Sequence, residues 1–329
     1  MKIAARFTSK RMFLAKVAFL VAWSSVHPAL AAAQGSQGQN AVYNNSNTAV
    51  GSSAFIDASM FAVRNGTICS VIYNILSQVN YSASVIDTRG LPSSTPATSM
   101  TCASGTTPWN NGATFQNKPS TILLPATGAN PMVIPTTWVL PSNTRLVGEG
   151  ENNPLTSTPG TTIQTPSGTL LSTMIQFGSS SVCGSSGCSG IAVEQLTLDG
   201  KAQAVHGIVN QFSQTNTYVD HVTLYQILGT GLLISGSGAN DSGPYTNITF
   251  DTGGYSGAPS TACAQIYQTA GTRGIHGLKC KSETSDANAA VLLDASNNSI
   301  EAGGPAYRVL CEGRVCSAVT AKMQESVLI

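Results

Sequence analysis

The chain has 329 residues, with 16 Lys and Arg against 15 Asp and Glu, and only 9% of its residues are charged. An average soluble domain carries about 25% charged residues, so this composition excludes highly charged disordered chains. It also argues against helical bundles and coiled coils, whose solvent faces need Glu, Lys and Arg. The surface must consist largely of uncharged Ser, Thr, Asn, Gln and Gly, which is typical of a β-rich secreted protein.

The first 33 residues have the three parts of a secretory signal peptide. Five basic residues open the segment, an apolar stretch covers 17–23, and small residues at 29–33 provide a cleavage site. The apolar stretch is shorter than the roughly 20 residues of a membrane span, so we expect a secreted protein, extracellular or periplasmic, with no membrane span. The alternative is an uncleaved anchor.

The charge balance of the remaining chain bears on its partners. Removing the five basic residues of the signal segment leaves 11 Lys and Arg against 15 Asp and Glu. A mildly acidic protein without basic clusters is a poor candidate for binding nucleic acid, and we expect no nucleic-acid partner.

All eight cysteines follow the signal segment, and in an exported chain an even number indicates disulfides. Pairing between neighbours in the sequence predicts three bridges: Cys69–Cys102, Cys183–Cys188 and Cys263–Cys280. Zinc binding is the alternative interpretation. It requires pairs of cysteines with the spacing of a zinc knuckle, which the sequence lacks, so we predict no metal site.

The elements expected next in the chain are a lead-in, a helix and a strand. Residues 34–64 are rich in small and polar residues without periodicity, and we expect a flexible N-terminal lead-in there. Apolar residues then recur at helical spacing over 67–79, which predicts a short amphipathic helix. The segment 84–90 predicts a strand that runs into a turn.

A repeat follows after residue 190. Leu196, Val222 and Ile248 stand 26 residues apart within similar six-residue segments, and a second series of short strands lies between them. A period of 22–30 residues, with two or three strands and no helix, predicts a parallel β-helix over residues 65–301. A β-sandwich or jelly roll is the competing fold, but it gives no reason for this period.

The β-helix makes two structural demands. Stacked coils bury the repeated apolar residues in continuous ladders, and strand alternation sends the residues between them outward. The open end of the coil stack must also be covered, and we expect the amphipathic helix to act as an N-terminal cap.

Three further segments carry a family resemblance. They are Val85-Ile86-Asp87-Thr88-Arg89-Gly90, the run Pro141-Ser142-Asn143-Thr144-Arg145-Leu146-Val147-Gly148-Glu149-Gly150, and Leu196-Thr197-Leu198-Asp199-Gly200. Together they resemble the pectate lyase superfamily, the exported bacterial proteins with a single-stranded right-handed parallel β-helix. The resemblance covers about residues 65–300 and implies a right-handed, all-β solenoid with polysaccharide as its ligand. It identifies the fold better than the activity, because members include hydrolases, lyases and proteins without a known reaction.

Glycoside hydrolysis is the first candidate activity. The polygalacturonase motifs are absent, since the sequence has no Asp-Asp pair and Asn216-Thr217 is followed by Tyr218. Hydrolysis in general needs two carboxyl groups, about 5–9.5 Å apart. Asp199 and Asp251 occupy equivalent outward positions two coils apart, which predicts a separation of about 9–10 Å between their backbones.

The candidate site is completed by residues on the neighbouring strands. We predict Asp199, His221 and Asp251 as catalytic residues, with Tyr225 and Asn247 in contact with the sugar. The alternative is that both aspartates only end strands, because Asp before Gly or Thr is common in turns.

Elimination and binding without cleavage are the other two hypotheses. A lyase would need a base and a group to hold the uronate carboxylate, so Asp241 and Arg273 are further predicted substrate contacts. We predict no cofactor, and calcium, which requires several oxygen ligands, is an alternative under the lyase hypothesis alone. The non-catalytic alternative is a carbohydrate-binding or cell-surface structural module. Polysaccharide is the expected partner in every case, and the oligomeric state stays open.

Residues 302–329 depart from the repeat, since this segment contains no Asn. One interpretation is a reading frame truncated or shifted near residue 302, which would make this an atypical tail. The other is a divergent C-terminal cap, which solenoids require.

Overall fold

The computed structural model describes residues 54–78, 83–110, 118–152, 159–251, 262–267, 272–282, 291–294, 310–313 and 319–322. The chain divides into two compact units, 1–46 and 47–329, and every described residue lies in the second. The predicted signal segment, residues 1–33, lies outside the described residues. No helix within the described part of the chain is long and apolar enough to cross a membrane.

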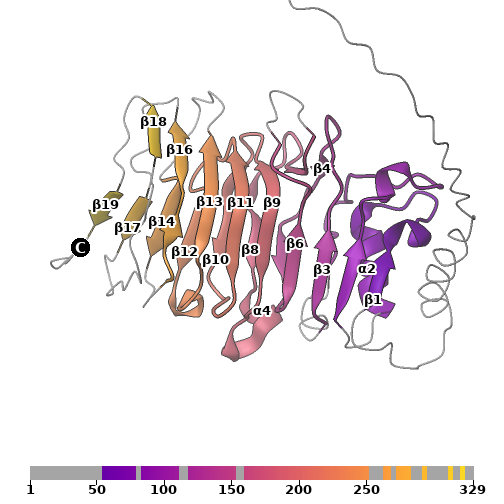
Figure 1. Cartoon of the computed structure of the whole chain (residues 1–329), viewed down its shortest axis with the longest axis horizontal. Coiled ribbons are helices and arrows are strands. Elements are labelled where there is room, and N and C mark those ends of the chain that lie inside the picture. Colours follow the sequence, from indigo (N-terminus) through magenta and orange to yellow (C-terminus); the bar gives the residue numbers. More distant parts are fainter. Residues whose placement is uncertain are drawn as a thin grey trace, which may run out of the picture. The chain divides into compact units, whose positions relative to one another are not determined.

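The strands form two sheets (Figure 1). Within each sheet, every pair of neighbouring strands that the structure describes is parallel. The larger sheet contains, in order across it, β1 (Ala54–Asp57), β2 (Ser84–Asp87), β3 (Ser120–Leu123), β6 (Thr144–Val147), β9 (Ala192–Asp199), β11 (Tyr218–Tyr225), β13 (Tyr245–Asp251), β16 (Lys279–Ser282) and β18 (Leu310–Gly313). Three short strands pair beside this path: β4 (Met132–Val133), β7 (Thr162–Gln164) and β15 (Ile275–His276).

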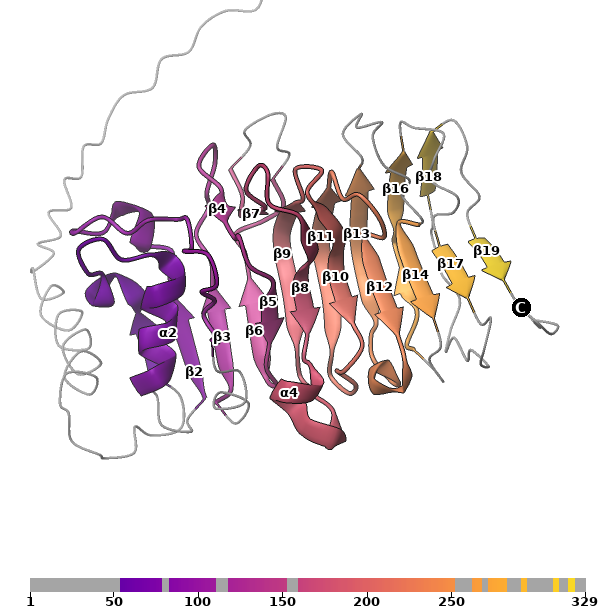
Figure 2. The same cartoon turned by 180° about the vertical axis from the view of Figure 1, so that it is seen from behind.

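The smaller sheet faces the larger one from the other side of each coil (Figure 2). Its strands, in chain order, are β5 (Trp138–Leu140), β8 (Leu171–Phe177), β10 (Ala204–Asn210), β12 (Leu232–Ser235), β14 (Ala264–Tyr267), β17 (Val291–Asp294) and β19 (Val319–Lys322). From β8 to β14 the chain alternates between the two sheets, so that each circuit adds one strand to each. This arrangement confirms the predicted all-β parallel solenoid.

The buried ladders confirm the register that the repeat predicted. Val222 pairs with Leu196 on one side and with Ile248 on the other, and all three side chains are buried. Leu224 pairs in the same way with Leu198 and Phe250. Burial of each such side chain contributes about 1.5–3 kcal/mol, so the ladders hold successive coils together.

The larger sheet bends sharply along one line. Gln195, His221 and Asn247 are in the left-handed backbone region, with φ values of 53°, 51° and 52°, and Gly277 follows with a φ of 70°. On β9 the residues before the bend pair with β6, while those after it pair with β7. Strict strand alternation therefore fails here, because the left-handed residue resets which side chains point inward.

The N-terminal helix α2 (Ile68–Gln78) forms where the periodicity predicted it. Thr67 and Ser70 cap it reciprocally: the Ser70 backbone N–H donates to Thr67 Oγ1 at 3.1 Å, and the Thr67 N–H donates to Ser70 Oγ at 2.9 Å. Its buried face belongs to the same core as the strands, at the end of the array that β1 and β2 form (Figure 2). This position agrees with a capping role.

Strands occur on both sides of the expected solenoid limits, 65 and 301. β1 lies within the segment assigned to the lead-in and pairs with β2. β18 and β19 lie beyond residue 301 and pair in parallel with β16 and β17. Most of the expected tail, including 302–309 and 323–329, lies outside the described residues.

The remaining described elements are short helices in the connections: η1 (Ala58–Phe61), η2 (Leu91–Ser93), α4 (Ser180–Cys183), η3 (Gly184–Ser186) and η4 (Ser237–Ala239). The three predicted disulfides, Cys69–Cys102, Cys183–Cys188 and Cys263–Cys280, are all present. Such bridges persist in oxidising compartments and indicate an extracytoplasmic protein.

Candidate functional site

The predicted catalytic residue Asp199 is buried inside a turn. Gln164 Nε2 donates to its Oδ2 at 2.8 Å, and the Lys201 backbone N–H donates to its Oδ1 at 3.0 Å. Lys201 Nζ lies 3.7 Å from Oδ2. Asp199 is fully buried, so it is not accessible to a substrate as the outward position suggested. Its contacts are those of a turn residue, the alternative that the sequence left open.

Asp251 and Tyr225 lie in the same ladder as Asp199. Tyr225 pairs in register with Asp199 on one side and with Asp251 on the other, so the two aspartates stand two coils apart as expected. Tyr225 is itself buried between them rather than exposed for sugar stacking. Lys281 Nζ lies 3.4 Å from Asp251 Oδ2. This ladder therefore offers little surface to a substrate.

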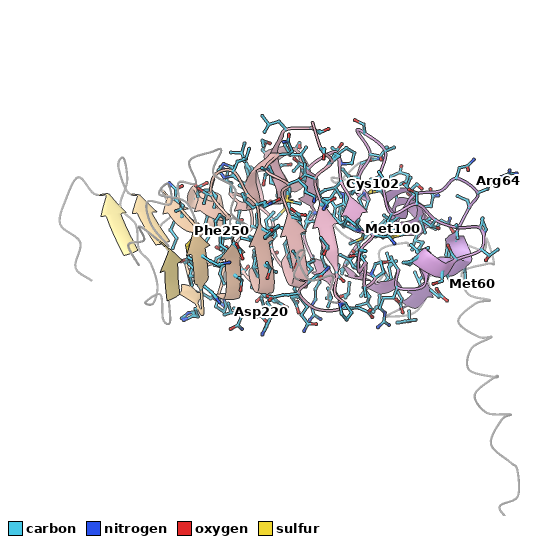
Figure 3. All side chains as sticks on the ribbon, turned by 90° about the horizontal axis from the view of Figure 1, so that it is seen from above. Met60, Arg64, Met100, Cys102, Asp220 and Phe250 are labelled. Carbon is cyan, nitrogen blue, oxygen red and sulfur yellow. A yellow bond between two sulfur atoms is a disulfide. The ribbon has the colours of Figure 1, made fainter. Side chains whose placement is uncertain are left out.

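A second group of polar residues gathers on the outer face of the bend. His221 Nδ1 lies 2.9 Å from Asp220 Oδ2, and the His221 side chain is 56% exposed. Asp220 Oδ1 accepts hydrogen bonds from Thr246 Oγ1 at 2.5 Å and from Asn247 Nδ2 at 3.0 Å. Figure 3 shows Asp220 at the outer edge of the coils, while Phe250 lies within them.

Glu151 reaches the same place from a different coil. It belongs to the connection between β6 and β7, which is fixed on both sides of it: the Gly150 N–H donates to the Gln195 carbonyl at 3.0 Å, and the Asn152 N–H donates to Thr197 Oγ1 at 2.9 Å. The Thr223 side chain and the charge of His221 favour the ionised form of the Glu151 carboxyl group, while the charge of Asp220 disfavours it. We call Glu151, Asp220, His221, Thr223, Thr246 and Asn247 the bend cluster.

The two carboxyl groups of the bend cluster titrate in opposite directions. Although Glu151 keeps an exposed surface, desolvation by the surrounding protein raises its pKa, and the nearby charge of Asp220 raises it further. Burial also disfavours ionisation of Asp220. Hydrogen bonds from Thr246, His221 and Asn247 more than offset that effect, so its pKa is lowered. The pKa values of the two carboxyl groups are thus shifted apart.

An ion pair borders the bend cluster. Arg145 donates to both carboxylate oxygens of Glu194, at 2.5 and 2.6 Å, and Tyr218 Oη donates to Glu194 Oε1 at 2.7 Å. Burial opposes ionisation of Glu194, but these hydrogen bonds outweigh it and its pKa is lowered. Glu194 pairs in register with Asp220, so the line of acidic residues continues along the bend.

The last two predicted substrate contacts lie on other connections. Asp241 follows η4, and Arg273 begins the next coil, where its backbone N–H donates to the Ser242 carbonyl at 2.8 Å. Among the described residues, neither side chain has a hydrogen bond to the bend cluster. The structure therefore brings His221 and Asn247 together at Asp220, and within the described residues no hydrogen bond joins Asp199, Asp241 or Arg273 to them.

No three His, Cys, Asp or Glu side chains within the described residues are arranged to hold a metal ion. Calcium stays a prediction that depends on the lyase hypothesis.

Sequence reasoning named neither Glu151 nor Asp220 as a catalytic residue. A signal was available for Glu151. In β9 one residue, Gln195, makes the bend, whereas the earlier coil inserts the connection 148–161 between β6 and β7 at the same place. An insertion at a bend that neighbouring coils make with one residue is typical of a functional loop.

No protein-family model matches the chain, and no curated protein matches it. The structure shows a parallel β-solenoid, and the resemblance to a particular family rests on the sequence motifs alone.

Proposed function

We propose that this protein is an exported β-helix protein, related in fold to the pectate lyase superfamily, that binds polysaccharide and hydrolyses it at the bend cluster. Glu151 is the general acid that protonates the glycosidic oxygen. Asp220 is the carboxylate that takes a proton from the attacking water. His221 and Asn247, which flank Asp220, are the residues that contact sugar hydroxyl groups.

The observation that carries this proposal is the pair Glu151 and Asp220. They interact electrostatically although they come from different coils, and their pKa values are shifted in opposite directions. Such a division is what a glycoside hydrolase requires of its acid and its base. The parallel β-helix and the motif resemblance add support for polysaccharide as the ligand.

The charge of the bend cluster favours hydrolysis of a neutral glycan over elimination from a uronan. The neighbouring cation Arg145 is already paired with Glu194, and His221 lies against Asp220. These two side chains are therefore engaged by protein carboxylates and are not available to hold a uronate carboxylate, whereas a neutral polysaccharide needs no such counter-charge.

The test is an activity screen of the purified protein against neutral and uronic polysaccharides. Release of reducing ends measures hydrolysis, and ultraviolet absorbance of an unsaturated product measures elimination. We expect hydrolysis of a neutral polysaccharide and a 10²- to 10⁴-fold loss of kcat, roughly, in Glu151→Gln and in Asp220→Asn. Asp241→Asn removes a carboxylate from an exposed connection outside the cluster and should keep the rate.

Three outcomes would contradict the proposal. Full activity in both Glu151→Gln and Asp220→Asn, with the fold verified by circular dichroism, would remove the catalytic assignment. Elimination in place of hydrolysis would favour the lyase. Tight binding without any product would favour the non-catalytic carbohydrate-binding module.

A further inference from the structure

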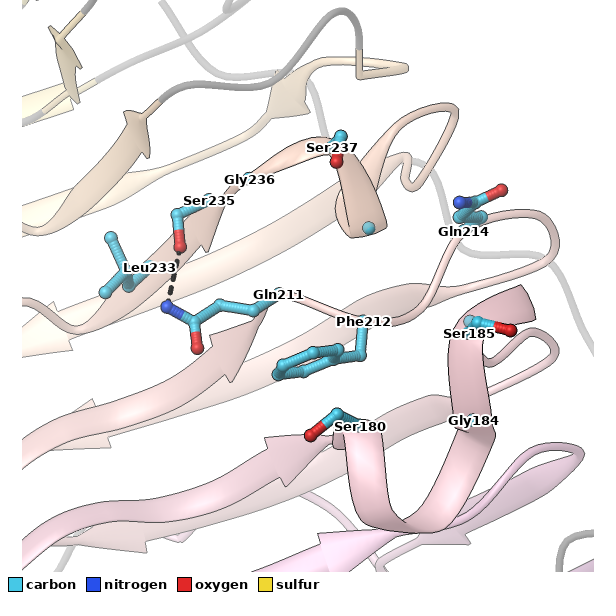
Figure 4. A pocket seen from close by; sticks show the side chains of 12 residues that line it. Ser180, Gly184, Ser185, Gln211, Phe212, Gln214, Leu233, Ser235, Gly236 and Ser237 are labelled. Atoms are coloured by element: carbon cyan, nitrogen blue, oxygen red, sulfur yellow. Dashed lines mark hydrogen bonds between the residues drawn. The ribbon is translucent and has the colours of Figure 1, made fainter. Parts of the chain in front are cut away.

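A groove with a volume of about 760 Å³ lies where three strands of the smaller sheet end. Its walls come from three successive connections: the one after β8, which contains α4 and η3, the one after β10, and the one after β12, which contains η4 (Figure 4). The residues that line it are Ser180, Gly184, Ser185, Gly187, Gln211, Phe212, Gln214, Leu233, Ser235, Gly236, Ser237 and Gly238. We call this the end groove.

The walls of the end groove are held in place before any ligand arrives. The Cys183–Cys188 disulfide closes the first connection on itself. The Cys188 N–H donates to the Phe212 carbonyl at 2.6 Å, and the Gln214 N–H donates to the Cys188 carbonyl at 3.0 Å. On the other side, a Cβ atom at Gly238 would lie 2.2 Å from the Gln211 carbonyl oxygen, so only glycine allows this approach. Preorganised walls reduce the entropic cost of binding.

The chemistry of the lining is that of a site for neutral sugar. None of the lining residues is charged, so an anionic ligand would find no counter-charge there. Phe212 is half-buried and presents an aromatic ring between Ser180 and Gln211 (Figure 4). Gln211 and Gln214 supply amide donors and acceptors, and Gln211 Nε2 already donates to Ser235 Oγ at 3.0 Å. The volume lies within the roughly 300–1,000 Å³ that small-molecule sites occupy.

We propose that the end groove is a second carbohydrate-binding site, which takes one or a few units of a neutral saccharide chain. The apolar face of a sugar ring packs on Phe212, and its hydroxyl groups exchange hydrogen bonds with Gln211, Gln214 and the serines of the rim. The end groove and the bend cluster share no residue, so this binding does not depend on the proposed hydrolysis.

Calorimetric titration of the full chain tests the proposal. The probes are neutral oligosaccharides of five or six units, from the cello-, xylo-, manno- and malto- series, with an oligogalacturonide as the anionic counterpart. The Glu151→Gln variant serves as the parent, so that hydrolysis at the bend cluster cannot consume the probe. We expect one of the neutral probes to bind this parent and the oligogalacturonide not to bind.

Substitutions in the parent locate the site. Phe212→Ala should weaken the affinity about tenfold, and Gln214→Ala should weaken it severalfold. Phe55→Ala is the matched control, because Phe55 is an exposed phenylalanine of β1 that does not line the groove. This variant should bind the saccharide probe with the affinity of the parent. Gln214→Ala keeps the test informative should Phe212→Ala fail to fold.

Two results would overturn the proposal. One is the absence of binding by every neutral probe at millimolar concentration. The other is affinity that stays unchanged in both Phe212→Ala and Gln214→Ala. Failure here would leave the proposed hydrolysis untouched, since that is measured by product release from the unsubstituted protein.

Discussion

The bend cluster and the end groove lie on the same coils and carry opposite chemistry. The bend cluster gathers acidic residues in a chain where only 9% of residues are charged, while the groove contains no charged residue. Both depend on the same buried ladders of apolar side chains. The difference teaches that a solenoid constrains its inward positions by stacking and leaves each outer surface free to acquire its own chemistry.

The largest effect should follow from disturbing what the two regions share. Val222 lies in the core between Leu196 and Ile248, and Val222→Asp places an unpaired charge there. We expect a loss of several kcal/mol in the free energy of unfolding, or no folded protein, with both the bend cluster and the end groove lost. Chemical denaturation followed by circular dichroism measures this.

Thr249→Asp is the control for that substitution, because Thr249 is an outward residue of the same larger sheet and pairs with Lys279. Its effect should be within about 0.5 kcal/mol. Equal losses in the two variants would contradict the inward and outward assignment.

The second prediction separates the two regions by pH. Hydrolysis requires Asp220 ionised, with its lowered pKa, and Glu151 protonated, with its raised pKa. The rate should rise with pH as Asp220 loses its proton and fall again as Glu151 loses its own, with an optimum between the two pKa values. Binding in the end groove should not change with pH, since no titratable side chain lines it. Rate and affinity measured across one pH series provide the comparison.

Glu151→Gln is the control for this pH dependence. Its residual rate, about 10²- to 10⁴-fold lower, should no longer fall on the alkaline side. An unchanged alkaline limb would assign that limb to a different group.

The fold could be predicted further than the site, and the reason is physical. The period of Leu196, Val222 and Ile248 is set by stacking, which acts on every coil and leaves a regular signal in the sequence. The electrostatic interaction between Glu151 and Asp220 has no such signal, because it depends on how one connection folds across two neighbouring coils. The burial of Asp199 was missed for a related reason, since alternation gives the direction of a side chain and not what covers it.

The third prediction concerns the ion pair at the edge of the bend cluster. Glu194→Gln removes the charge that Arg145 and Tyr218 contact, and it should cost about 1–2 kcal/mol of stability at neutral pH. The pKa of Glu194 is lower in the folded state, so its contribution is present at neutral pH and is lost as the pH falls through the folded pKa. The free energies of unfolding of the unsubstituted protein and of Glu194→Gln should therefore converge at acidic pH.

The affinity of the end groove for its saccharide probe serves as the control measurement for Glu194→Gln, and it should not change. A difference in stability that is constant from neutral pH down to the pH of acid unfolding would contradict a role for the Glu194 charge.

The smallest expected effect tests the bend itself. Gln195 has a φ of 53°, and a left-handed conformation costs a residue other than glycine about 1–2 kcal/mol. Gln195→Gly removes that strain. Glycine also gives the unfolded chain more conformational entropy, which lowers stability by about 0.5–1 kcal/mol, so we expect the free energy of unfolding to rise by about 0.5 kcal/mol. Gln176→Gly is the matched control, because Gln176 lies in β8 with extended backbone and gains nothing from glycine. Denaturation midpoints should move in opposite directions in the two variants, and a decrease in both would mean that the bend costs the folded chain no strain at Gln195.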